Sequence, residues 1–177
     1  MTEMTLLSQS FQIGDVQLTN RVLMAPLTRM RAFEGRAPGA LQVTHYTQRA
    51  SAGLIFTEAT SVTPMGVGYP NTPGIWSEQQ VAGWKQVTEA VHAAGGRMAI
   101  QLWHVGRISD PELLDGQQPV APSAIAAEGE VNVLRPKRPF PVPRALETAE
   151  VGAIVQDFVV AAQNAKEAGF DFVEVHA

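Results

Sequence analysis

The sequence of 177 residues contains no cysteine, which excludes a disulfide framework, a thiolate metal site and a cysteine nucleophile. An excess of charge is also missing, because the formal net charge is -4 and the basic residues are scattered apart from a small cluster at Arg135, Lys137 and Arg138. This balance gives no support to nucleic-acid binding. No apolar run approaches the ~20 residues that cross a membrane, and the N-terminal stretch lacks the basic and long apolar segments of a secretory signal. We therefore expect one soluble, cytoplasmic domain.

The apolar residues lie either in short runs, which are typical of strands, or at helical spacing. A hairpin is predicted over 11–18, around the turn pair Gly14-Asp15. Four further runs predict strands, the first two of them buried. The strands are expected at 21–25, 54–59, 98–102 and 172–176. Helices are expected at 40–50, between Ser77 and Gly95, and at 149–168, and the third of them shows an apolar stripe at helical spacing.

End signals mark the two longer helices. Ser77 with Gln80 three residues later predicts a capping box, and Gly95 stands where a C-terminal cap belongs. Thr148 is expected to cap the start of the third helix, and Gly169 is expected to end it. The limits of both helices are therefore predicted from local chemistry.

The alternation of strands and helices predicts a parallel sheet with right-handed crossovers. Two architectures remain open, a doubly wound sheet and part of a (β/α)8 barrel. A dinucleotide-binding sheet is expected to carry a G-x-G-x-x-G turn after its first strand, whereas residues 25–29 read APLTR and contain no glycine. This favours the barrel. A loop without predicted structure runs from 104 to about 148 and contains seven prolines, and loops of this length are often functional.

In such a barrel the active site lies at the C-terminal ends of the strands. The residues expected there are Pro26, Leu27, Thr28, Ala59, Thr60, Gln101, Trp103, His104 and His176. A hydroxyl, an amide and an imidazole beside a tryptophan suit a flat polar heterocycle, because the amide offers a ring edge both a donor and an acceptor. Ala59 leaves room for a ring to approach the backbone. The pattern specifies the shape of a ligand but no reaction, and nothing has metal-ligand spacing.

Five segments, in order along the chain, resemble the motifs of the Old Yellow Enzyme family. They are 20–29 (NRVLMAPLTR), 50–60 (ASAGLIFTEAT), 73–77 (PGIWS), 101–107 (QLWHVGR) and 169–177 (GFDFVEVHA). Within the family, the sequence is most similar to the bacterial N-ethylmaleimide and xenobiotic reductases. The resemblance implies an α/β fold, a TIM (β/α)8 barrel with non-covalent FMN. Residues 1–177 would form its N-terminal half, with the hairpin, strands 1–4 and helices 1–3.

The resemblance also implies an ene-reductase. NAD(P)H reduces the flavin, and hydride passes from flavin N5 to an activated alkene, such as an α,β-unsaturated carbonyl compound, a nitroalkene or a maleimide. The implied flavin contacts are the segment Ala25, Pro26 and Leu27 along the ring, Thr28 at O4, the backbone of Ala59, and Gln101 at N3 and O2. His176 is the implied catalytic residue, because it would polarise the carbonyl or nitro oxygen of the substrate. Trp103 and Tyr69 would shape the substrate pocket.

The family continues past His176 with an Ala-Asn-Gly-Tyr-Leu-like stretch that supplies a second carbonyl donor and a proton donor, and its later strands bring an arginine and a phosphate site. None of these residues is in this sequence. Half a barrel has open edges, so we expect a complementary C-terminal half-barrel or self-association. Two function classes stay open, an FMN enzyme and a structural half-barrel without chemistry of its own. A barrel aldolase is disfavoured, because the three lysines lie in predicted helices or loops.

Overall fold

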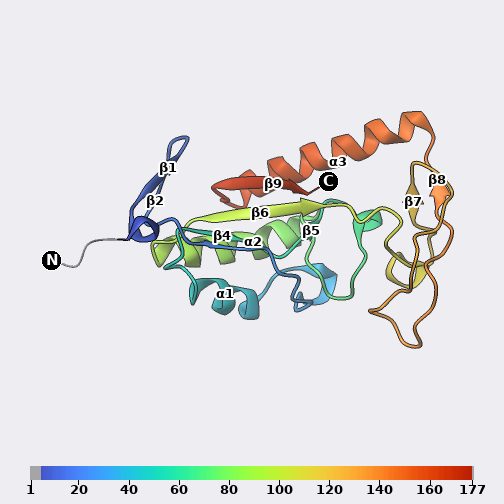
Figure 1. Cartoon of the computed structure of the whole chain (residues 1–177), viewed down its shortest axis with the longest axis horizontal. Helices are drawn as coiled ribbons and strands as arrows, with labels where there is room; N and C mark the ends of the chain where they lie inside the picture. Colours follow the sequence, from blue (N-terminus) through green and yellow to red (C-terminus); the bar gives the residue numbers. More distant parts are fainter. Residues whose placement is uncertain (1–4, 177) are drawn as a thin grey trace.

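The chain folds into a small hairpin followed by a parallel sheet with its helices, as a computed structural model of residues 5–176 shows (Figure 1). The hairpin joins β1 (Phe11–Ile13) to β2 (Val16–Leu18) in antiparallel register. Gly14 in the turn has a φ of 56°, the left-handed conformation that glycine adopts without strain. The predicted hairpin is confirmed.

Four parallel strands form the main sheet, in the spatial order β3 (Leu23–Met24), β4 (Leu54–Phe56), β6 (Met98–Trp103) and β9 (Phe172–His176). A short β5 (Thr60–Ser61) continues the β4 segment along β6. The crossovers contain α1 (Ala40–Thr47), α2 (Glu78–Ala93) and α3 (Thr148–Glu167). Spatial order follows chain order without the reversal that defines a doubly wound sheet. The sheet is therefore one side of a (β/α)8 barrel.

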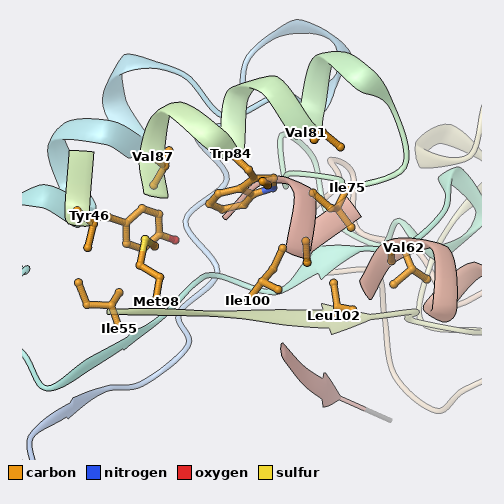
Figure 2. Packing of buried hydrophobic residues seen from close by; sticks show 14 of the residues in the cluster. Tyr46, Ile55, Val62, Ile75, Val81, Trp84, Val87, Met98, Ile100 and Leu102 are labelled. Atoms are coloured by element: carbon orange, nitrogen blue, oxygen red, sulfur yellow. The ribbon is translucent and has the colours of Figure 1, made fainter. Parts of the chain in front are cut away.

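The main core lies between the sheet and its helices. Met98, Ile100 and Leu102 of β6 point toward α2, whose Trp84 is fully buried against them (Figure 2). Tyr46 of α1 joins the same cluster beside Trp84, with 6.2 Å between the ring centroids. Because side chains alternate along a strand, the other residues of β6 face the interior of the barrel.

The hairpin closes the interior at the N-terminal ends of the strands. Leu18 of β2 is buried against Leu54 and Ala99, which begin or nearly begin their strands. Val16 and Phe172 pack against the same group. The hairpin therefore covers the N-terminal end of the interior, which we call the floor, while the C-terminal ends of the strands lie opposite it.

Several predicted boundaries need correction. The first strand is only two residues long, and Leu23 is 50% exposed rather than buried, because β3 is at the edge of the sheet and Leu23 lines an open groove there. The first helix ends at Thr47, before the predicted 50. The third helix begins with Glu147 at the cap position instead of Thr148, and the Glu147 backbone N–H donates to the Glu150 carboxylate at 2.7 Å. Gly169 ends that helix as predicted, with a φ of 86°.

The segment 104–148, predicted as a loop without structure, contains some secondary structure. It contains a short helix (Pro111–Leu113) and the paired strands β7 (Val120–Ala121) and β8 (Arg144–Ala145). We call residues 119–145 the flap. Proline removes backbone donors, and pairing within the flap consists of the two-residue strands and one isolated bridge, between Glu130 and Pro139. The flap lies beyond the C-terminal end of β6 (Figure 1).

Three further helical turns lie at Leu6–Ser8, Glu34–Arg36 and Pro64–Gly66. Within residues 5–176, no helix is both long and apolar enough to cross a membrane.

Candidate functional site

The predicted ligand-binding residues come from the C-terminal ends of neighbouring strands, which we call the rim. Gln101 and Trp103 lie on β6, and His176 ends β9 beside them. Ala59 lies between β4 and β5, and the segment 25–28 follows β3. Because parallel strands in register end at the same edge of a sheet, these residues share one end of the barrel half.

Gln101 is fixed in place at the rim. It is 8% exposed, and its Nε2 donates to Oε2 of Glu174, which lies opposite it on β9, at 3.0 Å. Its backbone N–H donates to the Thr57 hydroxyl at 3.2 Å. Among residues 5–176, the Gln101 amide oxygen and the second hydrogen of Nε2 have no hydrogen-bond partner. The amide therefore presents one acceptor and one donor in a set orientation.

Two aromatic rings and an imidazole lie next to this amide. The rings of Tyr69 and Trp103 stack with 5.5 Å between centroids and 14° between planes. The Trp103 indole N–H donates to the Ser61 hydroxyl at 3.1 Å, which holds the ring. His176 lies directly opposite Trp103 in the register of β6 and β9, so the two side chains share the interior face. An exposed imidazole thus stands beside an aromatic wall.

His176 also borders a cavity on the side of α3. This cavity of about 300 Å³ is mainly apolar and is lined by residues that include Ile154, Phe158 and His104. Burial lowers the pKa of His104, which favours the neutral form of this imidazole. The two faces available to His176 are therefore an aromatic one inside the barrel and an aliphatic one under the flap.

The segment after β3 approaches the rim from the other side. The Leu27 side chain is 66% exposed, and the half-buried Thr28 hydroxyl makes no hydrogen bond within the described chain. Ala59 is buried, and its side chain is only a methyl group. The structure therefore places Thr28 and Ala59 at the same end as Gln101, as the sequence predicts.

Sequence reasoning missed two carboxylates at this end. Glu174 orients the Gln101 amide, and its alternation with Phe172 and His176 along β9 was a signal that it faces inward. Glu58 is buried at the end of β4, and burial raises its pKa, although backbone N–H groups of Arg29 and Met30 partly offset this rise. Neither residue lies in a metal cluster, since no such cluster exists among residues 5–176.

These residues fit the edge of a flavin ring. A flavin pyrimidine edge alternates donors and acceptors, and the fixed Gln101 amide supplies the complementary pair. Within the described chain the Thr28 hydroxyl has no hydrogen-bond partner, and Ala59 carries only a small side chain. The donor set at the rim is therefore chemically suited to the cofactor that the sequence resemblance implies.

Comparison with known proteins gives a consistent result. The model of the NADH:flavin oxidoreductase / NADH oxidase family matches residues 7–177. A putative 12-oxophytodienoate reductase 4 of Oryza sativa subsp. japonica is 45% identical over 168 residues, covering 94% of this chain and 43% of the rice protein. A chanoclavine-I aldehyde reductase of Penicillium roqueforti (strain FM164) is 42% identical over 179 residues, covering 98% of this chain and 46% of the fungal protein.

Two solved structures are similar throughout. Morphinone reductase in complex with tetrahydroNAD is 56% identical with a TM-score of 0.90, covering 97% of this chain and 49% of that one. The old yellow enzyme homologue from Zymomonas mobilis is 44% identical with a TM-score of 0.92, covering 98% of this chain and 48% of that one. The chain spans about half the length of the relatives it matches. The predicted TIM-barrel half is confirmed.

Proposed function

Since the chain belongs to the NADH:flavin oxidoreductase / NADH oxidase family, we propose that it forms the N-terminal half of an FMN-dependent ene-reductase. The complete barrel reduces the activated C=C bond of α,β-unsaturated carbonyl compounds, nitroalkenes or maleimides with NAD(P)H. The observation that carries this proposal is the Gln101 amide, which Glu174 holds at the rim with one donor and one acceptor free. When bound, FMN supplies the hydride transfer from N5 to the alkene.

The residues of the rim hold the flavin from two sides. Gln101 bonds N3 and O2 of the pyrimidine edge, and Thr28 donates its hydroxyl hydrogen to O4. The segment 25–27 lines the ring with its backbone, and Ala59 touches the ring through the backbone as well. A hydrogen bond to O4 becomes stronger as negative charge develops on the reduced ring, so Thr28 stabilises that state.

His176 binds the substrate. Its imidazole donates a hydrogen bond to the carbonyl or nitro oxygen of the alkene, where negative charge develops during the reaction. Trp103 and Tyr69 stack on each other at the same end and form the wall against which the apolar part of the substrate packs. The polar oxygen and the apolar body of the substrate thus meet different residues.

A complementary C-terminal half-barrel completes the fold on both open sides. At one side, β9 pairs only with β6 among the described strands, and Val175 is 62% exposed. At the other side, a groove of about 790 Å³ runs along β3, and its lining includes Val22 and Leu23. A parallel barrel requires a neighbouring strand at each edge and helices over the grooves. Without the second half, these apolar surfaces favour self-association.

The test compares the chain alone with the chain mixed with the C-terminal half of morphinone reductase. We expect the mixture to elute as a one-to-one complex, to show the visible absorbance of bound flavin, and to oxidise NADPH when 2-cyclohexenone is added. Gln101→Leu is expected to weaken FMN binding about tenfold, because a charge-neutral hydrogen-bonding pair is lost. Gln86→Leu, on the exposed face of α2, is the matched control and leaves FMN binding unchanged.

A complex that forms but never takes up flavin would overturn the proposed function. The remaining alternative, a structural half-barrel without chemistry, predicts that outcome together with normal assembly. A chain that stays a well-behaved monomer in the presence of the second half contradicts the proposed completion instead.

A further inference from the structure

We propose that Glu58 is a positioning residue for the flavin, because its buried carboxylate holds the segment that carries Thr28. The inference rests on the proposed function. Glu58 is 1% exposed, and its Oε2 accepts the backbone N–H of Arg29 at 2.9 Å and that of Met30 at 3.3 Å. One oxygen thus binds the two peptide groups that directly follow Thr28.

The segment 27–31 depends on this carboxylate. It contains no helix or strand, and within the described chain its backbone N–H groups have no other hydrogen-bond acceptor. Met30 has a φ of 54°, a left-handed conformation that is strained for a residue other than glycine. The two hydrogen bonds that the Glu58 side chain accepts from Arg29 and Met30 hold the segment in this conformation.

Glu58 is itself held by the core. Its backbone N–H donates to the Tyr46 hydroxyl at 2.9 Å, in a fully buried setting. Tyr46 packs beside Trp84 of α2, which is completely buried. The neighbouring residue in the chain is Ala59, a predicted flavin contact. Glu58 therefore connects two predicted flavin-contacting segments, one through the chain and one through hydrogen bonds.

The hydrogen bonds to Arg29 and Met30 use Oε2 alone, and Oε1 is buried without a hydrogen-bond partner in the described chain. The role of the carboxylate is to set where the Thr28 hydroxyl lies relative to Ala59. Removing the carboxylate leaves two N–H groups without their acceptor and lets the segment 27–31 move. The change reaches the flavin through Thr28, so the effects of altering Glu58 and Thr28 must be coupled.

The experiment uses the FMN-loaded complex and measures the FMN dissociation constant and the flavin midpoint potential. Glu58→Ala is expected to raise the dissociation constant about tenfold and to shift the potential in the same direction as Thr28→Ala. Glu58→Gln keeps the shape and one acceptor oxygen, so it is expected to stay within about threefold of the wild type. Glu89→Gln, exposed on α2, is the control and changes neither quantity.

The decisive measurement is the double variant. Glu58→Ala should shift the potential less in the Thr28→Ala background than in the wild type, whereas equal shifts in both backgrounds would overturn the positioning role. If Glu58→Ala does not fold, Glu58→Asp replaces it in the same cycle, because it keeps the charge and shortens its reach. A wild type that takes up no FMN refutes the proposed function. A wild type that binds FMN while Glu58→Ala behaves like the control refutes this inference alone.

Discussion

The helices α2 and α3 have similar apolar stripes but different surroundings. α2 has 16 residues and buries seven of them, including Trp84 and Val87. α3 has 20 residues and buries only Ala161 and Ala165, while Val155 is 59% exposed. The difference shows that a stripe at helical spacing predicts which face of a helix is apolar, but not whether the same chain covers that face.

The two regions are also held together by different interactions. The α2 region is stabilised by apolar burial around the sheet. The region of α3 and the flap relies more on ion pairs, because Arg138 binds Asp110 and Glu112, and Arg144 binds Glu150. We therefore expect the stability of the α2 region to fall when side chains are truncated. The stability of the region of α3 and the flap should instead depend on pH.

The largest expected effect is at the centre of the α2 region. Trp84→Ala removes a fully buried ring and the indole N–H that donates to the Gly74 carbonyl at 3.1 Å. We expect the free energy of unfolding to fall by about 3–5 kcal/mol, as for other buried aromatic truncations. Val155→Ala on α3 is the matched control, with a change of about 0.5 kcal/mol or less. Urea unfolding measures both, and similar losses would remove the distinction between the two helices.

A smaller effect is expected where the flap is anchored. Hydrogen bonds from Arg138 hold the pKa of Asp110 below its ordinary value of 3.8. The unfolded chain therefore binds a proton more readily, so this stabilisation is present above the ordinary value and is lost as the pH falls through the lower folded value. Asp110→Asn should reduce the free energy of unfolding by about 1.5 kcal/mol at neutral pH. The loss is small because solvent around the partly exposed Arg138 weakens the ion pair.

Asp110→Asn should also flatten the decline in stability at acid pH. Urea titrations on both sides of the ordinary pKa measure this slope. Glu128→Gln is an exposed control within the flap. An acid decline as steep in Asp110→Asn as in the wild type would show that another carboxylate is responsible.

The smallest effect compares the starts of the two helices. The Ser77 hydroxyl accepts the backbone N–H of Gln80 at 3.3 Å, and the Gln80 side chain accepts the Ser77 N–H at 3.1 Å. Ser77→Ala should therefore reduce the free energy of unfolding by about 1 kcal/mol. Thr148→Ala should have almost no effect, because Glu147 is at the cap position of α3. Equal losses in the two variants would mean that Thr148 caps α3 after all.

Local chemistry explains which parts of the fold were predictable. Gly14, Gly95 and Gly169 all have positive φ values at the turn or helix end where the sequence suggests them. These signals involve neighbours a few residues apart. The short length of β3 and the pairing within the flap depend on contacts with distant segments, and therefore the sequence pattern could not set them.

The same reason explains what was missed at the rim. The motif positions of Gln101 and His176 are visible in the sequence, but the partners that orient the site are far away along the chain. Glu174 is 73 residues from Gln101, and Glu58 is 29 residues from Arg29. A carboxylate at a strand end has no pattern that tells which backbone it will bind, so only the three-dimensional arrangement reveals its role.

The floor that the hairpin provides affects how molecules enter the completed barrel. Leu18 packs against Leu54 and Ala99 and covers the N-terminal end of the interior, so the rim is the end that stays open to entering molecules. In the ene-reductase that we propose, the nicotinamide donor and the alkene acceptor would both reach the flavin from the rim.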